Sequence, residues 1–183
     1  MKKIIITFTL ILPGFCFGQN TPDTAYIFWS KSRRLQESDF QIKAAHVANT
    51  YSFGQFSFDY KIGSVFGLPK DYKKKIRNYF IRSASWIDTT YDVSTSLNYQ
   101  QTLFDLAEVY VRRFRKQVYE NRKKIIWGKL NINELNVQTM TEFSKRRVLY
   151  DTDTHFGTKA DRQKEWEIEI EKELDALKEF SAD

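Results

Sequence analysis

The sequence has few histidines and cysteines, the side chains that most often bind zinc together with carboxylates. The chain has two histidines, His46 and His155, and a single cysteine, Cys16. Asp105 and Glu108 lie three residues apart in a stretch with helical spacing, so a helix would bring their carboxylates close together. Because catalytic zinc sites generally use three protein ligands that include histidine, His155 with Asp105 or Glu108 forms one candidate metal site.

The same residues also have structural interpretations. His155 lies two residues before Gly157, which is typical of a turn. His46 falls in an alternating stretch and would lie on one face of a strand. Glu108 is four residues before Arg112, which is the spacing of an ion pair along a helix. We expect these structural roles and keep the metal site as the alternative.

The first 18 residues have the features of a secretory signal peptide. Met1–Lys3 is basic, residues 4–17 are almost wholly apolar, and small residues stand at Cys16 and Gly18. We expect cleavage after Gly18 and export to the periplasm or the extracellular space, with an uncleaved N-terminal anchor as the alternative. The apolar run is shorter than the about 20 residues that a membrane-spanning helix needs, so we expect no transmembrane span after cleavage.

Residues 19–183 are predicted to form a single domain. The chain has 183 residues, of which 42% are hydrophobic and 16% aromatic, and this composition excludes collagen-like, mostly disordered and multi-span membrane proteins. Basic residues gather at 70–77, 112–116 and 122–124, and we expect most of them to face solvent. Such runs could also bind an unidentified protein or a cell-envelope component. No nucleic-acid partner is expected, because the chain lacks a recognisable binding module.

The first half of this domain has the spacing of β-strands. Residues 26–29 and 75–87 are predicted strands. Alternating apolar residues on both sides of Gly54 and Gln55 predict a β-hairpin within residues 44–60.

The second half has the spacing of α-helices. Apolar residues recur at intervals of three and four, which predicts helices over residues 94–122, 131–149 and 161–180. The predicted fold class is therefore α+β, with a small antiparallel sheet followed by a helical C-terminal half.

Several short motifs follow one another along these elements. Two expected strands end in Trp29–Ser30 and in Ser85–Trp86. The first predicted helix contains Phe104–Asp105, and residues 150–157 are followed by Gln163–Trp166. In this order and spacing the motifs resemble a bacterial family of predicted secreted zinc-dependent proteases.

The resemblance covers about residues 26–175 and implies a zincin-like signature helix at about 94–122. In the family this helix reads His-Glu-x-x-His-Phe-Asp-Ile, and a third histidine precedes a glycine in the C-terminal motif. The resemblance implies that the two helix histidines bind zinc from one face, while the glutamate takes a proton from metal-bound water.

This sequence departs from the family at the chemical positions. Tyr99 and Leu103 stand where the helix histidines are expected, Gln100 replaces the glutamate, and Phe156 replaces the C-terminal histidine. Leucine cannot bind zinc, glutamine has no proton-accepting carboxylate, and tyrosine, with a pKa near 10, is a poor ligand. His155 lies one residue early, and in an extended segment this shift would turn its side chain to the opposite face.

We therefore expect an exported non-catalytic relative of that family, without zinc or another cofactor, that binds another protein or an envelope component. One alternative is an active zinc metallopeptidase with a rebuilt site that includes His155. Another is a structural envelope protein unrelated to proteolysis. A helix over 94–122 packed beside residues 150–157 would favour the relative of the protease family over the structural protein.

Overall fold

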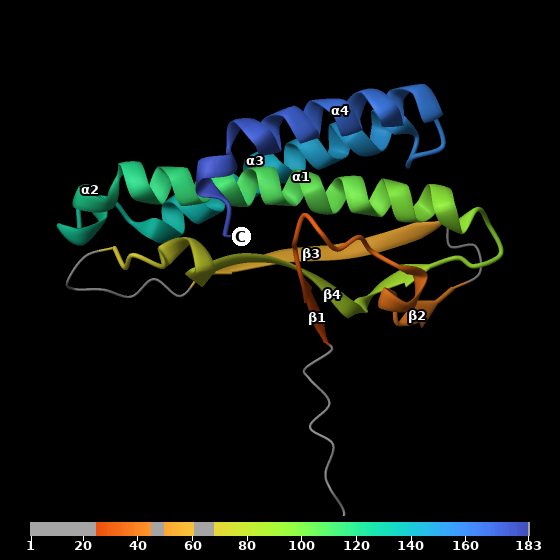
Figure 1. Cartoon of the computed structure of the whole chain (residues 1–183), viewed down its shortest axis with the longest axis horizontal. Coiled ribbons are helices and arrows are strands. Elements are labelled where there is room, and N and C mark those ends of the chain that lie inside the picture. Colours follow the sequence, from red (N-terminus) through yellow and green to blue (C-terminus); the bar gives the residue numbers. More distant parts are fainter. Residues whose placement is uncertain (1–24, 45–49, 61–67, 183) are drawn as a thin grey trace, which may run out of the picture.

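The computed structural model describes residues 25–44, 50–60 and 68–182. The expected signal peptide, Cys16 and His46 lie outside these residues. Short strands come first and four helices follow, which confirms the α+β fold class. Figure 1 shows the sheet on one side of the molecule and the helices stacked on the other.

The sheet is organised around one long central strand, β4 (Ile76–Ile87). Along one edge β4 pairs antiparallel with β3 (Ser52–Tyr60). Opposite β3, β4 pairs antiparallel with β1 (Tyr26–Phe28) and parallel with β2 (Ile42–Lys43). The sheet is therefore mixed and not purely antiparallel as predicted, because the chain reverses direction between β1 and β2, through a short 3-10 helix at Glu37–Asp39.

β3 is one continuous strand where a hairpin was predicted, so that prediction is wrong. The chain does not turn back at Gly54. Instead, the register with β4 shifts between Phe53 and Gln55, as in a β-bulge. A Cβ at Gly54 would lie 2.5 Å from Gln100 Oε1 and 2.7 Å from the Phe56 ring. Glycine is needed there because another segment approaches the strand closely, and not because the chain turns.

The C-terminal half consists of α1 (Val93–Glu120), α2 (Arg122–Ile126), α3 (Ile132–Thr154) and α4 (Ala160–Ala176). The three predicted helices are confirmed, and α3 continues past its predicted end at residue 149. α1 begins after Asp92, whose carboxylate caps the helix by accepting a hydrogen bond from the Thr95 N–H at 3.1 Å. No helix within the described ranges is long and apolar enough to cross a membrane.

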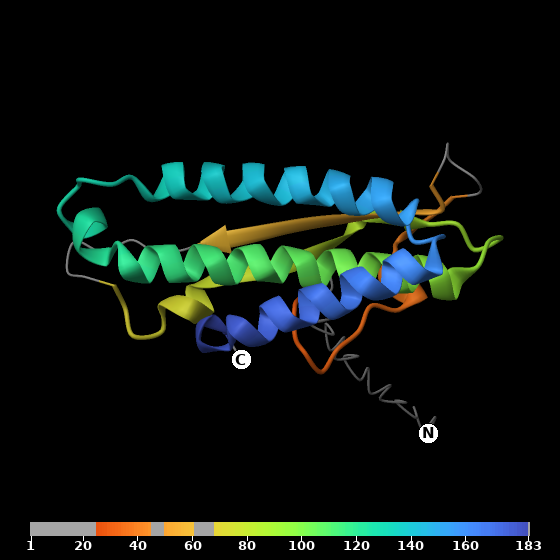
Figure 2. The same ribbon diagram turned by 90° about the horizontal axis from the view of Figure 1, so that it is seen from above.

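α1 lies at the centre of the molecule, with the sheet on one side and α3 and α4 on the other. Figure 1 shows α4 above α1 and the sheet below it, and Figure 2 shows α1 running between α3 and α4. Aromatic rings fill the contact with the sheet. Phe104 packs against Phe56 and Phe80, with ring centroids 5.3 Å and 6.3 Å apart. Because α1 is covered on both sides, most of its residues are buried, polar ones included.

Candidate functional site

The predicted ligand positions on α1 are occupied by core side chains. Gln100 and Leu103 are 0% exposed and Tyr99 is 2% exposed. Tyr99 meets Phe156, the fourth degenerate position, with ring centroids 6.3 Å apart in an edge-to-face arrangement. The structure therefore brings the start of the signature helix against residues 150–157. We call this packed region the closed junction, defined by Tyr99, Gln100, Leu103 and Phe156.

Tyr99 makes a hydrogen bond and a ring stack at the closed junction. Its hydroxyl donates to Asp151 Oδ1 at 2.5 Å, and its ring stacks on Tyr150 with centroids 5.2 Å apart. Burial, together with the nearby Asp151 carboxylate, raises the pKa of Tyr99 far above its ordinary value. Tyr99 is therefore a neutral hydrogen-bond donor, whereas binding zinc would require its phenolate.

Residues 150–157 are not extended, so the expected effect of the one-residue shift at His155 is wrong. α3 runs on to Thr154, and His155, Phe156 and Gly157 then adopt φ angles of 50°, 56° and 84°. A Cβ at Gly157 would lie 2.6 Å from Tyr99 Cβ. Glycine is therefore required twice over, by the left-handed backbone and by the close approach of α1. The predicted turn beside Gly157 is confirmed, and His155 is exposed on it.

Gln100 lies against Gly54 of β3, where the register with β4 shifts. Its Nε2 donates to Ser52 Oγ at 3.0 Å, while Oε1 has no hydrogen-bond partner in the part of the chain that the structure describes. A glutamate in place of Gln100 would be buried, and the one hydrogen-bond partner that Gln100 has among the described residues is the Ser52 hydroxyl. The amide carries no charge and so avoids the large cost of burying an unpaired carboxylate.

The alternative metal ligands are not brought together. His155 is exposed on the turn, Asp105 bonds to an indole, and Glu108 is buried between two arginines. Across the three described ranges, no group of three or more His, Cys, Asp or Glu side chains could hold a metal ion.

The predicted helical ion pair at Glu108 is confirmed and is part of a larger buried cluster. Glu108 Oε1 accepts from Arg112 Nε at 3.1 Å and from Arg115 Nη1 at 2.7 Å. Arg115 also donates to the Ile76 carbonyl at 2.6 Å, and Arg112 donates to the Leu174 carbonyl at 2.8 Å. Both arginines are buried, so the expectation that this basic run faces solvent is wrong for these two. Glu108 supplies one negative charge for the two arginines, and backbone carbonyls accept hydrogen bonds from both guanidinium groups.

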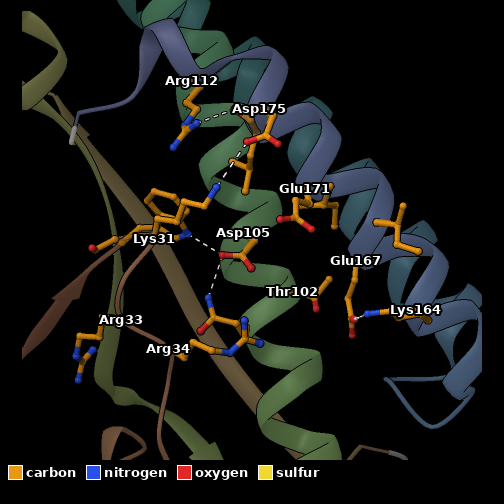
Figure 3. A pocket seen from close by; sticks show the side chains of 16 residues that line it. Lys31, Arg33, Arg34, Thr102, Asp105, Arg112, Lys164, Glu167, Glu171 and Asp175 are labelled. Carbon is orange, nitrogen blue, oxygen red and sulfur yellow. Dashed lines mark hydrogen bonds and ion pairs between the residues drawn. The ribbon is translucent and has the colours of Figure 1, made fainter.

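A polar cleft of about 310 Å³ opens beside α1. Its walls come from the segment that follows β1, from α1 and from α4, as Figure 3 shows. Asp105 lies on the α1 wall, where its Oδ1 accepts from Trp29 Nε1 at 2.7 Å and from Gln101 Nε2 at 2.9 Å. Gln101 Oε1 accepts in turn from the Leu35 N–H at 2.8 Å. We call this region the Asp105 cleft.

The side walls of the Asp105 cleft carry opposite charges. The segment after β1 contributes three basic residues, Lys31, Arg33 and Arg34. α4 contributes three acidic residues and one lysine, Glu167, Glu171, Asp175 and Lys164. The two walls meet in an exposed ion pair between Lys31 Nζ and Asp175 Oδ1 at 3.7 Å. Burial raises the pKa of Asp105, although its hydrogen bonds from Trp29 and Gln101 oppose this effect.

Sequence reasoning named Asp105 as a conceivable metal ligand but missed this cleft. The Trp29–Asp105 bond joins residues 76 positions apart, and no local pattern indicates it. The only available signal was that Trp29 and Asp105 both belong to the motifs of the resemblance.

Comparison of the chain with family models, with curated proteins and with solved structures found no match. The resemblance to the predicted secreted zinc-dependent proteases therefore rests on the motif residues alone and stays a prediction.

Proposed function

We propose that this protein is an exported, non-catalytic binding domain related to the predicted secreted zinc-dependent proteases. The observation that carries the proposal is the closed junction. Tyr99 and Phe156 occupy the positions of two expected ligands and pack against each other. The contact of α1 with residues 150–157 is the arrangement that favours this relationship over an unrelated structural protein.

The residues at these positions lack the groups that metal-assisted hydrolysis requires. Such a reaction needs a metal with an open coordination position and a base that takes a proton from its water. Leu103 has no donor atom, Gln100 has no basic carboxylate, and the buried Tyr99 hydroxyl is held neutral. All three side chains are also closed off from solvent, so neither water nor substrate reaches them.

A binding role is supported by the Asp105 cleft. It lies beside the signature helix and is lined by charged side chains on three walls. The proposed ligand is another protein or a component of the cell envelope.

A peptidase assay on an unstructured protein substrate, with and without added zinc, tests the loss of catalysis. We expect no cleavage that depends on zinc. The matched variant is His155→Ala, since His155 is exposed and its replacement leaves the core intact. Zinc-dependent cleavage by the purified protein would contradict the proposal, and its disappearance in His155→Ala would assign the activity to a site that includes His155.

Export is tested by sequencing the N-terminus of the protein recovered from the producing bacterium. We expect a mature chain that begins at Gln19 and is found outside the cytoplasm. Recovery of a chain that begins at Met1 in the cytoplasm would contradict this part of the proposal.

A further inference from the structure

We propose that the Asp105 cleft binds a short peptide with both termini charged. The ammonium group of the peptide lies toward Asp105 and the acidic residues of α4, and its carboxylate lies toward the basic segment that follows β1. This inference rests on the proposed binding function and goes beyond it, because the ligand is a short free peptide and not a protein or an envelope component.

The first supporting observation is the state of the Asp105 carboxylate. Both of its hydrogen bonds end on Oδ1, and no hydrogen bond from the described residues reaches Oδ2. The two donors, an indole and an amide, are neutral. A partly buried carboxylate with neutral donors gains from a cation that enters the cleft, because charge-assisted hydrogen bonds are the stronger ones.

The second observation is that each side wall has a charge available to a ligand. On the acidic wall, Glu171 takes part in no ion pair within the described residues. On the basic wall, Arg34 donates a 3.4 Å hydrogen bond to Asn98 and forms no ion pair within the described residues. Its charge also acts on Asp105 and partly offsets the rise that burial causes in the pKa of that carboxyl. Figure 3 shows Arg34 and Glu171 on opposite sides of Asp105. A ligand with a single charge would meet repulsion from one wall, whereas a zwitterion is complementary to both.

The third observation concerns the rim, where Lys31 pairs with Asp175. The two side chains are 76% and 65% exposed, so this ion pair contributes little to stability and is easily exchanged for pairs with a ligand. A peptide can therefore replace it with one carboxylate and one ammonium, without leaving a charge unpartnered.

The fourth observation is that the cleft is held in shape before any ligand arrives. The hydrogen bonds from Leu35 to Gln101, from Gln101 to Asp105 and from Trp29 to Asp105 tie the segment after β1 to α1. Preorganisation of this kind lowers the entropic cost of binding. The volume of about 310 Å³ lies at the lower end of small-ligand pockets, which suits a peptide of two or three small residues.

The test uses four forms of trialanine: both termini free, N-acetylated, C-amidated, and blocked at both ends. Binding is followed by the NMR signals of the labelled protein, with the Trp29 indole N–H as the reporter. We expect saturable binding of the free peptide and at least about a tenfold weaker affinity when either end is blocked. Equal affinities for all four forms, or no saturable shift with the free peptide, would overturn the inference.

Variants assign the two ends of the peptide. We expect Asp105→Asn to weaken binding of the free peptide by about tenfold and to leave the N-acetylated form unaffected. Arg34→Ala should weaken binding of the free peptide and leave the C-amidated form unaffected. Glu171→Gln should act on the ammonium end, as Asp105→Asn does, and it leaves the core untouched because Glu171 is exposed. Lys116→Ala, whose lysine pairs with Glu120 away from the cleft, is the control. If Asp105→Asn, Glu171→Gln or Arg34→Ala weakens binding of all four forms equally, the assignment of the two peptide ends is contradicted.

The same samples separate this inference from the proposed function. Cleavage of the free peptide, seen as the appearance of alanine and dialanine signals, would overturn the non-catalytic function. Absence of both binding and cleavage would overturn the inference alone.

Discussion

One helix, α1, carries both the closed junction and the Asp105 cleft, and the two differ in what their side chains can do. Tyr99 and Leu103 lie four residues apart on one face and are buried against other parts of the core. Gln101 and Asp105 also lie four residues apart, but their face keeps polar groups beside a cavity. The α1 face to which the resemblance assigns zinc is packed core, whereas the neighbouring face borders the Asp105 cleft, to which we assign ligand binding.

The difference shows that the order of sequence motifs does not by itself establish a chemical site. At the closed junction, the order of the motifs resembles that of the protease family, but Tyr99, Gln100, Leu103 and Phe156 differ from the residues that the family's zinc chemistry would need. At the Asp105 cleft, Trp29 and Asp105 belong to two of the motifs, but these motifs do not predict the charged groups and the open volume that meet there. We therefore expect substitutions at the closed junction to lower the free energy of unfolding strongly, and substitutions at the rim of the Asp105 cleft to change it little.

The largest expected effect is on stability at the closed junction. Leu103→Ala should lower the free energy of unfolding by about 4 kcal/mol, because it leaves a cavity in a fully buried site. Ile168→Ala, at a residue that is 44% exposed and lines the cleft, should cost less than about 1 kcal/mol. Urea unfolding of both variants measures the difference. Equal losses would show that the two regions are packed alike.

Gly157 and Gly128 both have positive φ, so alanine substitutions at the two separate the cost of backbone strain from the cost of a close contact. Gly157→Ala should cost about 3 kcal/mol, since it adds a close contact with Tyr99 to the strain of the left-handed backbone. Gly128 has φ +66°, and a Cβ added there would meet no atom of the described residues within 4 Å apart from its chain neighbours, so Gly128→Ala should cost only about 1 kcal/mol. If thermal and urea unfolding give the same loss for both, α1 does not press on the turn as described.

A pH series tests the bond between Tyr99 and Asp151. Burial raises the pKa of Asp151, and the Tyr99 hydroxyl and Arg147 partly offset this. A carboxyl with a raised folded pKa holds its proton more tightly when folded, so its contribution to stability is greatest below the ordinary pKa of 3.8 and declines as pH rises through the folded value.

Tyr99→Phe removes one of the groups that lower this pKa, so the decline should deepen and extend to higher pH. We expect a loss of about 1–2 kcal/mol at pH 7 and a smaller loss near pH 3, measured by urea unfolding. Tyr119→Phe, at a residue that is 42% exposed, serves as the control. A loss that does not change with pH would mean that the hydroxyl does not support the Asp151 carboxylate.

The smallest effect is expected at the rim of the Asp105 cleft. Lys31→Ala breaks the exposed pair with Asp175 and should change the free energy of unfolding by no more than about 0.5 kcal/mol. A loss above about 1 kcal/mol in urea unfolding would show that the rim is part of the folded core and not an exchangeable contact.

The fold could be predicted from the sequence where hydrophobic spacing was long and regular. The three-and-four spacing of apolar residues in α1 was clear because the apolar side of this helix faces a continuous core. The hairpin was wrongly predicted because a buried glycine in a bulge and a glycine in a turn have the same sequence signature. α3 extends past its predicted end because residues 150–154, which were interpreted as part of an extended motif, continue the helix, where Tyr150 and Asp151 contact Tyr99 of α1.

The candidate site was predictable only where the contacts are local. The Glu108–Arg112 pair follows from helical spacing alone. The burial of Arg115 depends on the carbonyl of Ile76, and the cleft depends on the meeting of Trp29 with Asp105. Such contacts between distant segments arise from tertiary packing, which local patterns do not encode.

Metal content measured by mass spectrometry tests the central claim most directly. The protein is purified without chelator, soaked in zinc and freed of excess metal. The account predicts a zinc content near zero per chain, because the closed junction is filled by Tyr99, Gln100, Leu103 and Phe156. About one zinc per chain, lost in His155→Ala, would contradict it and would place a working metal site where the structure shows a packed core.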